Sequence, residues 1–310
     1  MTRSAVEQRA FITTTAHGLD FDSFPMRLFQ KSKRLGVWDP ADIDFAQDHE
    51  DWLRLATEER EALMQQVALF LAGEESVTLD LLPLIMVVAQ EGRQEGRIEE
   101  EMYLTSFLWE EAKHVEGFRR FCDAVAHDHS DLSRFHGPNY RRIFYDELPT
   151  AMNRLKTDSS PVAQARASVT YNMIVEGVLA ETGYHSYHQT LTRHGLMPGM
   201  QQLVGYVKRD ESRHIAFAVY FLSRLVARHG AVAWDAIEVR MNELLPYAIG
   251  VIDDSFDLFD GHPPFGVRKD SLIDYAVAQF RKRLDRIAHA RTQSLDEVAA
   301  MADETGGGLD

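Results

Sequence analysis

Ser106-Phe-Leu-Trp-Glu-Glu111-Ala-Lys-His114 and Lys208-Arg-Asp-Glu211-Ser-Arg-His214 are the two stretches that decide the fold. Each ends in a Glu-x-x-His step within an apolar sequence of helical character. Residues three apart lie on the same face of an α-helix, so each step presents one carboxylate and one imidazole to the same point. Such a step is one half of a metal site in a helix bundle.

Two further glutamates extend these steps into a pattern. Chance alone supplies about one Glu-x-x-His match in a chain of this composition, so the steps by themselves are weak evidence. Glu74 lies in the apolar stretch Leu69-Phe-Leu-Ala-Gly-Glu-Glu-Ser-Val77, and Glu176 lies in Tyr171-Asn-Met-Ile-Val-Glu-Gly-Val-Leu-Ala180. Each precedes the glutamate of the next Glu-x-x-His step by a separation that would bring the two glutamates level in a pair of antiparallel helices. The order Glu, then Glu-x-x-His, therefore occurs twice.

The charges of this set indicate two metal ions. An unpaired ionised carboxylate in a helix core costs several kcal/mol even after relaxation. Two divalent cations would balance four carboxylates, and two neutral imidazoles would complete the ligand shells. We therefore predict a di-metal site made by Glu74, Glu111, His114, Glu176, Glu211 and His214. The alternative is a set of solvated surface glutamates with two core histidines.

Three neighbouring residues bear on this site. Glu75 competes with Glu74 as the first ligand, but Glu74 shares its helical face with the apolar Val77, which favours Glu74. Asp210 is a candidate acceptor for an imidazole N–H, which would fix the tautomer of a ligand histidine; a solvent-facing aspartate is the alternative. Tyr184 shares a helical face with Glu176 and is a candidate to line a cavity or to belong to the core.

The rest of the chain reads as helices separated by polar turns. We predict helices over residues 57–91, 95–125, 140–155, 161–192, 232–251, 253–259 and 270–290, with a further helix carrying Glu211. Pro83 should kink the first of these. Residues 1–37 are expected to be irregular and residues 292–310 to be a disordered tail. These features predict an all-α single domain over residues 1–310, a ferritin-like four-helix bundle core elaborated with additional helices.

Composition excludes several classes of partner. A net charge of −15 and a pI near 5.3 argue against binding to nucleic acid or to an anionic membrane. The longest apolar run, residues 81–89, is too short to span a bilayer, and the N-terminus has no signal-peptide pattern. The single cysteine, Cys122, fits a reducing compartment. We expect a cytoplasmic protein whose partners are small molecules or protein.

Between residues 60 and 225 the sequence resembles the ribonucleotide reductase small-subunit superfamily. The strings Gly73-Glu-Glu-Ser-Val-Thr-Leu-Asp80 and Glu110-Glu-Ala-Lys-His114 are most similar to its small-subunit-like ligand-binding oxidases. The resemblance implies a homodimeric bundle with a manganese/iron pair that activates dioxygen beside a bound long-chain fatty acid. The ligand types alone suit a di-iron pair equally well.

Position 118 distinguishes this chain from radical-generating small subunits. Those proteins carry their radical tyrosine one helical turn after the first ligand histidine, where this chain has Phe118, and no aromatic residue follows Phe280. The resemblance therefore implies no delivery of a radical to a large subunit, although some small subunits with a manganese/iron pair also carry phenylalanine there. A ribonucleotide reductase small subunit and a non-enzymatic metal- or lipid-binding bundle stay open as alternatives.

The resemblance also implies a covalent crosslink. In these oxidases a valine three residues after the first ligand and a tyrosine five residues before the third become joined by an ether; here they are Val77 and Tyr171. Val77 shares the metal-facing side of its helix with Glu74. Tyr171 would lie about 140° around an α-helix from Glu176, so periodicity alone places it in the core. The expected chemistry is a two-electron C–H oxidation, of Val77 or of an acyl ligand whose identity the sequence leaves open.

Overall fold

The computed structural model describes the backbone of residues 11–306 and the side chains of residues 11–300. All regular structure in that range is helical, with no strand, which confirms the all-α fold class. The α-helices are α1 (Phe24–Leu35), α2 (Ala46–Arg54), α3 (Thr57–Asp80), α4 (Leu82–Gln94), α5 (Glu99–Phe121), α6 (Pro138–Arg141), α7 (Leu148–Arg154), α8 (Pro161–Ser168), α9 (Glu181–His194), α10 (Pro198–His229), α11 (Ala231–Asp257), α12 (Lys269–His289) and α13 (Leu295–Gly306). The π-helices are η3 (Cys122–Ala126), η5 (Arg142–Glu147) and η6 (Val169–Ala180); the 3-10 helices are η1 (Ile12–Thr14), η2 (Pro40–Asp42), η4 (Leu132–Phe135), η7 (Pro264–Gly266) and η8 (Ala290–Thr292).

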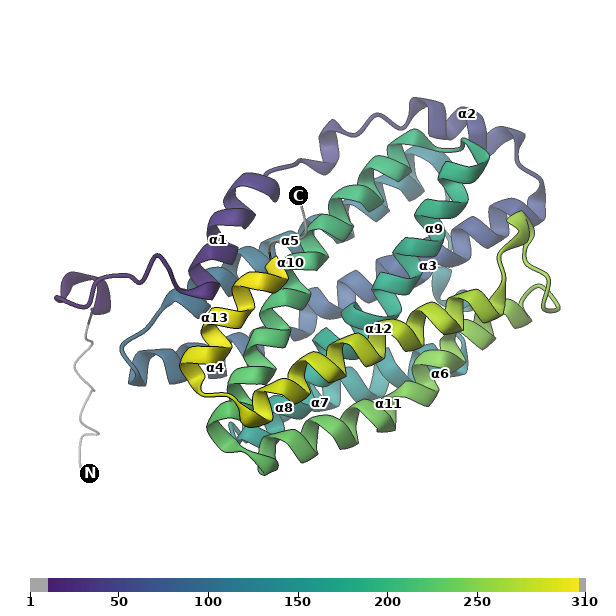
Figure 1. Ribbon diagram of the computed structural model, residues 1–310. Helices are drawn as coiled ribbons and strands as arrows, with labels where there is room; N and C mark the ends of the chain where they lie inside the picture. The colour runs from purple at the N-terminus through teal and green to yellow at the C-terminus, as the bar shows by residue number, and fades with distance from the viewer. Residues whose placement is uncertain (1–10, 307–310) are drawn as a thin grey trace, which may run out of the picture.

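Four segments form the centre of the bundle: α3, α5, the continuous η6–α9 helix and α10 (Figure 1). Helix α3 packs against α5, and α10 packs against α5, η6 and α9. The ends of these helices follow from their sequences. Acidic residues 99–101 open α5 and Arg119 and Arg120 close it, which complements the helix dipole. Pro198 opens α10, and Gly230 ends it with a φ of +60°, a conformation that glycine adopts readily.

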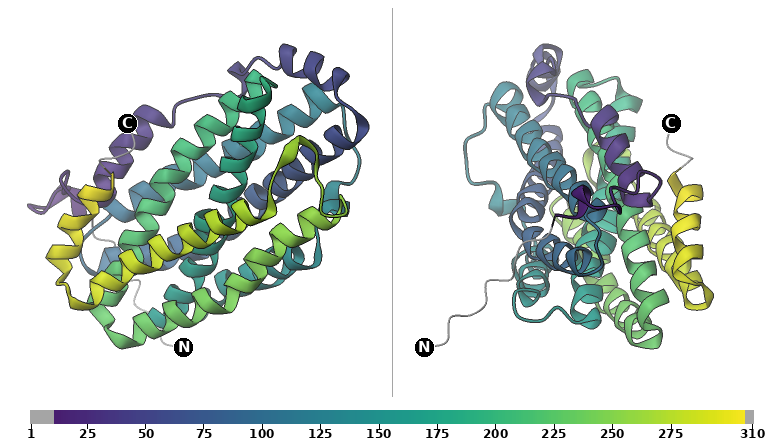
Figure 2. Two further views of the ribbon diagram at one scale, coloured as in Figure 1. Left: turned by 45° about the vertical axis from the view of Figure 1, so that its right-hand side comes forward. Right: turned by 90° about the vertical axis from the view of Figure 1, so that its left-hand side faces the viewer.

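The remaining helices cover this centre. Helices α11 and α12 lie side by side along one face of the molecule, and both contact η6 (Figures 1 and 2). Helices α6 and α8 pack on α11, and α13 packs on α10 near α1. No helix in the described part of the chain is both long enough and apolar enough to cross a membrane.

Two apolar clusters divide the core, and a polar layer lies between them. On α5, Leu104 and Phe107 belong to one cluster and Phe118 and Phe121 to the other. On α10 the order is reversed, with residues 203–207 in the second cluster and residues 217–222 in the first. The residues between these positions on both helices include the two Glu-x-x-His steps. The fold therefore places both steps at one level.

Several predicted boundaries differ from the structure. The helix expected over residues 57–91 is divided at Leu81 into α3 and α4, in agreement with the interruption predicted from Pro83, which lies at the start of α4. The helices expected over residues 232–251 and 253–259 form one helix, α11, despite Pro246 in its interior. The helix expected over residues 140–155 is α6, η5 and α7 in succession.

Both terminal segments contain helices that the sequence pattern does not show. The prediction that residues 1–37 are irregular is wrong for α1, which buries Phe24, Met26 and Leu28. The predicted disorder after residue 292 is wrong for α13, and residues 307–310 lie outside the described part. Short helices gain most of their stability from packing, because their own propensity is too weak to hold them folded. Here α1 packs on α5 and α10, and α13 packs on α10.

Candidate metal centre

The six predicted ligand residues meet between the four central segments. Each is at most 5% exposed. In chain order they come from α3 (Glu74), α5 (Glu111, His114), η6 (Glu176) and α10 (Glu211, His214). They form two overlapping groups whose candidate ligand atoms all lie within 4.8 Å of one another: Glu74, Glu111, His114 and Glu211, and Glu111, Glu176, Glu211 and His214. Two carboxylates belong to both groups, so the arrangement suits a pair of ions with bridging ligands.

Both imidazoles turn Nδ1 toward the carboxylates and Nε2 away from them. His114 Nδ1 lies 3.5 Å from Glu111 Oε2, and His214 Nδ1 lies 3.1 Å from Glu111 Oε1. On the other side of each ring, His114 Nε2 lies 3.4 Å from Asp210 Oδ2, and His214 Nε2 lies 2.9 Å from Glu110 Oε2. Carboxylates that accept from Nε2–H leave the Nδ1 lone pair for a metal ion. Asp210 thus lies where the sequence suggested.

A second layer holds these two outer carboxylates in place. The Arg213 Nη2 donates to Glu110 Oε1 and to Asp210 Oδ1, both at 2.6 Å. Lys113 Nζ lies 3.3 Å from Asp210 Oδ2, and Trp38 Nε1 donates to the same oxygen at 2.8 Å. Two cations therefore balance two carboxylates in this layer, which makes it neutral without any metal.

The six predicted ligand residues, which we call the inner cluster, have no such balance of charge. Four of its buried atoms lack a hydrogen-bond partner in the described structure: Glu111 Oε2, Glu176 Oε1, Glu211 Oε2 and His214 Nδ1. Buried acceptors without a partner are rare and costly. Burial raises the pKa of Glu74 to about 8, and burial together with the neighbouring Glu211 and Glu111 raises the pKa of Glu176 well above its usual range. Cations would accept these lone pairs and stabilise the ionised carboxylates, so the residues fit a metal pair.

The other predicted residues surround this cluster. The Tyr184 hydroxyl donates to Glu74 Oε1, and the ring of Phe118 is parallel to that of Tyr184 with centroids 6.1 Å apart. Val77 is 2% exposed and lines a cavity together with Glu74. Glu75, in contrast, is exposed, so the helical-face argument for Glu74 agrees with the structure.

Tyr171 reaches the cluster because η6 is a π-helix. The expectation that Tyr171 points about 140° away from Glu176 assumes the α-helical repeat. In a π-helix hydrogen bonds join residues five apart, which brings Tyr171 and Glu176 to similar angular positions. The Tyr171 hydroxyl donates to Glu111 Oε1 at 3.3 Å. Tyr171 is thus a core residue, as periodicity predicts, and it also contacts the site. Asn172 donates to Glu176 Oε2 at 3.0 Å from the same helix.

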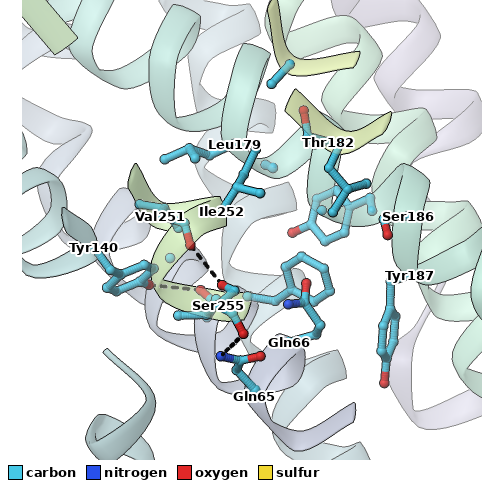
Figure 3. A pocket seen from close by; sticks show the side chains of 18 of the residues that line it. Gln65, Gln66, Tyr140, Leu179, Thr182, Ser186, Tyr187, Val251, Ile252 and Ser255 are labelled. Carbon is cyan, nitrogen blue, oxygen red and sulfur yellow. Dashed lines mark hydrogen bonds between the residues drawn. The ribbon is translucent and has the colours of Figure 1, made fainter. Parts of the chain in front are cut away.

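An apolar cavity of about 150 Å³ is lined by residues of α3, the η6–α9 helix, α11 and the segment leading into α12. Figure 3 shows side chains that line it, among them Leu179, Ile252 and Ser255. Three inner carboxylates line it: Glu74, Glu176 and Glu211. Most other lining residues are apolar, including Leu69, Phe70, Val77, Phe144, Val175, Leu179, Val251, Ile252 and Phe256. A small-molecule site with this composition takes a mainly apolar ligand.

The sequence analysis missed four residues of the second layer: Trp38, Glu110, Lys113 and Arg213. One of them left a signal. An acidic residue directly precedes the glutamate of both Glu-x-x-His steps, Glu110 in the first and Asp210 in the second. The structure shows that each of these acids accepts from the histidine of the other step.

Comparisons with known proteins agree with this geometry. The profile of the family described as ribonucleotide reductase, small chain, matches residues 28–287. A solved structure of an R2-like ligand-binding oxidase with an aerobically reconstituted Mn/Fe cofactor is 41% identical, with 91% of this chain and 98% of that chain covered and a TM-score of 0.85. A mutant of an R2-like ligand-binding oxidase with an anaerobically reconstituted Mn/Fe cofactor is 42% identical, with 93% and 100% covered and a TM-score of 0.85. This chain therefore belongs to the ribonucleotide reductase small-chain family and, within it, to the R2-like ligand-binding oxidases.

Proposed function

We propose that this protein is a dioxygen-dependent oxidase that binds a long-chain fatty acid beside a manganese/iron pair. The observation that carries the proposal is the contact between cavity and metal centre: Glu74, Glu176 and Glu211 belong to both. A ligand in the cavity would therefore meet the metal ions directly. The similar structures hold a Mn/Fe cofactor, and the same oxygen and nitrogen donors also suit a di-iron pair.

The six inner residues would hold the two ions, with Glu111 and Glu211 shared between them. A bound manganese/iron pair would supply the reduction of dioxygen coupled to oxidation of a C–H bond. The outer carboxylates Asp210 and Glu110 would keep each imidazole in its metal-binding tautomer. Phe118 has no phenol, so this position cannot store a tyrosyl radical for a partner subunit.

The proposal includes an autocatalytic ether crosslink between Val77 and Tyr171. Both side chains are buried, and the Tyr171 hydroxyl donates a hydrogen bond to Glu111. In the crosslink the Tyr171 O–H and the Val77 Cβ–H bonds break, a C–O bond forms, and two electrons and two protons pass to dioxygen. Glu111 is placed to accept the phenolic proton in that reaction.

An intact-mass measurement tests this chemistry. Metal-free protein is loaded with Mn(II) and Fe(II) without oxygen, and one half is then exposed to air. We expect the aerated wild-type chain to lose the mass of two hydrogen atoms, and peptide mapping to join the peptides that contain Val77 and Tyr171. The anaerobic half and the Tyr171→Phe variant should keep their mass. Full metal occupancy with an unchanged mass after aeration would contradict the crosslink, and oxygen consumption by the same sample tests the oxidase activity separately.

We also propose that the protein is a homodimer with no large-subunit partner. Leu79, Leu82 and Met86 lie around the junction of α3 and α4 and are 68%, 51% and 67% exposed. Apolar side chains gathered in this way favour contact with another protein surface. Light scattering of the purified chain should give the mass of two chains.

A further inference from the structure

The two halves of the metal centre offer the same donors. One group of candidate ligands has Glu74 and His114 as its own members. The other group has Glu176 and His214, and both groups share the same two glutamates. We call these groups the His114 half and the His214 half. Each unshared glutamate also accepts one hydrogen bond from a neutral group, a tyrosine hydroxyl or an asparagine amide. The ligand atoms alone therefore predict equal affinity for a cation in the two halves.

The outer layer repeats one plan in both steps but departs from symmetry. In each Glu-x-x-His step an acid precedes the glutamate and a basic residue precedes the histidine. These residues are Glu110 and Lys113 in the first step, and Asp210 and Arg213 in the second. Arg213 Nη2 donates to both acids at 2.6 Å, whereas Lys113 Nζ forms its ion pair with Asp210. In the described structure Asp210 thus pairs with one more basic side chain than Glu110 does.

Three donors compete for one oxygen of Asp210. Trp38 Nε1 lies 2.8 Å from Oδ2, Lys113 Nζ lies 3.3 Å from it, and His114 Nε2 lies 3.4 Å from it. A carboxylate oxygen has about two lone-pair sites for hydrogen bonds. The tryptophan and the lysine therefore leave little of this oxygen for the imidazole.

The corresponding oxygen in the other half has a single donor. Glu110 Oε2 accepts from His214 Nε2 at 2.9 Å, and no other donor among the described residues shares it. Arg213 reaches the second oxygen of this carboxylate instead. The hydrogen bond that supports His214 is therefore shorter and stronger than the one that supports His114.

Lys113 has a defined position in this layer. It is 6% exposed, and its Nζ donates to the Gly36 carbonyl oxygen at 2.5 Å. The same nitrogen lies 4.1 Å from the ring centroid of Trp38 and 4.4 Å from that of Trp109, which are favourable cation–π distances. The segment with Gly36 and Trp38 follows α1, which packs on α5 and α10 (Figure 1). The fold therefore holds both competing donors against Asp210.

We propose that Lys113 and Trp38 make the two halves unequal, so that the His214 half binds its cation more tightly than the His114 half. The inference rests on the proposed function, because it assumes the metal pair. A carboxylate that accepts from Nε2–H raises the basicity of the imidazole and strengthens its bond to a metal ion. His214 has this support in full. His114 shares it with two competitors and is the weaker donor. Lys113 and Trp38 are thus positioning residues that act through Asp210.

Titration of the full chain with Mn(II) alone tests this proposal, because manganese binding is then measured without oxygen chemistry at iron. Glu74→Ala removes the unshared glutamate of the His114 half and leaves the His214 half, and Glu176→Ala does the reverse. The EPR signal of free Mn(II) gives the affinity of the half that remains in each variant. We expect the remaining His214 half to bind Mn(II) roughly 10-fold more tightly, the lower end of the usual effect of an outer partner.

Second substitutions assign the difference to the outer layer. Trp38→Phe removes a donor from Asp210 without a change of charge, and Lys113→Met removes the other donor. Each should raise the Mn(II) affinity of the Glu176→Ala variant by about 3- to 10-fold, the range of one net hydrogen bond. Each should leave the affinity of the Glu74→Ala variant nearly unchanged, because His114 does not serve the half that remains there.

Trp52→Phe is the matched control for Trp38→Phe. Trp52 is also largely buried, at 8% exposed, but its ring packs on Phe121 in an apolar cluster. This substitution should change the Mn(II) affinity of neither variant.

The outcomes separate this inference from the proposed function. Equal Mn(II) affinities of the Glu74→Ala and Glu176→Ala variants would overturn the inequality and leave the metal pair intact. A difference that persists after both outer substitutions, or an equal gain in both variants, would overturn the competition at Asp210. Failure of the wild-type chain to bind two Mn(II) ions would overturn the metal centre itself, and the inference with it.

Discussion

Glu111 and Glu74 occupy different places in the candidate metal centre. Glu111 belongs to both ligand groups, whereas Glu74 belongs to one. We therefore expect Glu111→Ala to lose most of both ions, and Glu74→Ala to lose mainly the ion of its own group. Elemental analysis of desalted protein after metal loading measures this difference.

The control for that experiment is the residue beside Glu74. Glu75 carries the same charge on the same helix but is exposed, so Glu75→Ala should retain the full metal content of the wild type. A Glu111→Ala variant that still bound two ions per chain would contradict a shared ligand at this position.

Individual site residues could be predicted where metal binding requires a fixed spacing of residues along a helix. The meeting of the six inner side chains follows from the Glu-x-x-His steps and the preceding glutamates, because helical geometry relates spacing to position. Trp38 has no such relation to the site: it meets Asp210 across 172 residues of sequence through the packing of the whole chain. Arg213 lies within a Glu-x-x-His step, but nothing in the spacing shows that its guanidinium joins the two outer carboxylates.

The π-helix η6 is the element that sequence periodicity could not predict. Residues 169–178 are all buried, polar and apolar alike, so they give no exposed polar face from which to read a repeat. The wider turn of the π-helix brings Tyr171 and Glu176 to similar angular positions. Elements of this kind are rare and occur often at functional sites, which agrees with the position of η6 beside the metal centre.

Gly177 allows η6 to approach α12 closely. A Cβ atom at this position would lie 2.8 Å from Arg283 Nε and 3.0 Å from the Asn172 carbonyl oxygen, and Arg283 is itself buried. We expect Gly177→Ala to lower the free energy of unfolding by about 1–3 kcal/mol, the usual range for overpacking. Thermal denaturation of the metal-free chain measures it.

A second glycine provides the matched control for that substitution. Gly205 lies in the interior of α10, where an added Cβ would meet no atom within 4 Å. Gly205→Ala should therefore raise the free energy of unfolding by about 0.5–1 kcal/mol, through the better helix propensity of alanine. Equal destabilisation by both substitutions would show that the contact with Arg283 is not the cause.

At the scale of the whole molecule, the bundle separates a neutral outer layer from a charged inner cluster. Arg213 and Lys113 compensate Glu110 and Asp210, while no lysine or arginine of the described residues pairs with the four inner carboxylates. The long central helices could be predicted from their apolar pattern, whereas α1 and α13 could not, because they depend on packing against that finished bundle. We therefore expect the stability of the inner cluster to depend on metal binding.

This dependence predicts how the metal-free protein responds to pH. Burial raises the pKa of Glu74 to about 8 in the folded chain, against an ordinary value of 4.5. Between these values the unfolded chain has released this proton and the folded chain retains it, so stability falls as the pH rises. From pH 6 to pH 8 the Glu74 contribution lowers the free energy of unfolding of the metal-free protein by about 2 kcal/mol.

Metal binding should reverse this trend. Ligand carboxylates must be ionised to bind a cation, so metal affinity rises with pH. The metal stabilises the folded chain by an amount that grows with the logarithm of the free metal concentration divided by the dissociation constant. Denaturation in chelator should thus give a lower melting temperature at pH 8 than at pH 6, and the metal-loaded protein should not show this loss. Glu74→Gln, which cannot ionise, should flatten the metal-free profile. A metal-free wild-type profile that rises over this range would contradict a buried cluster of carboxylates that only cations balance.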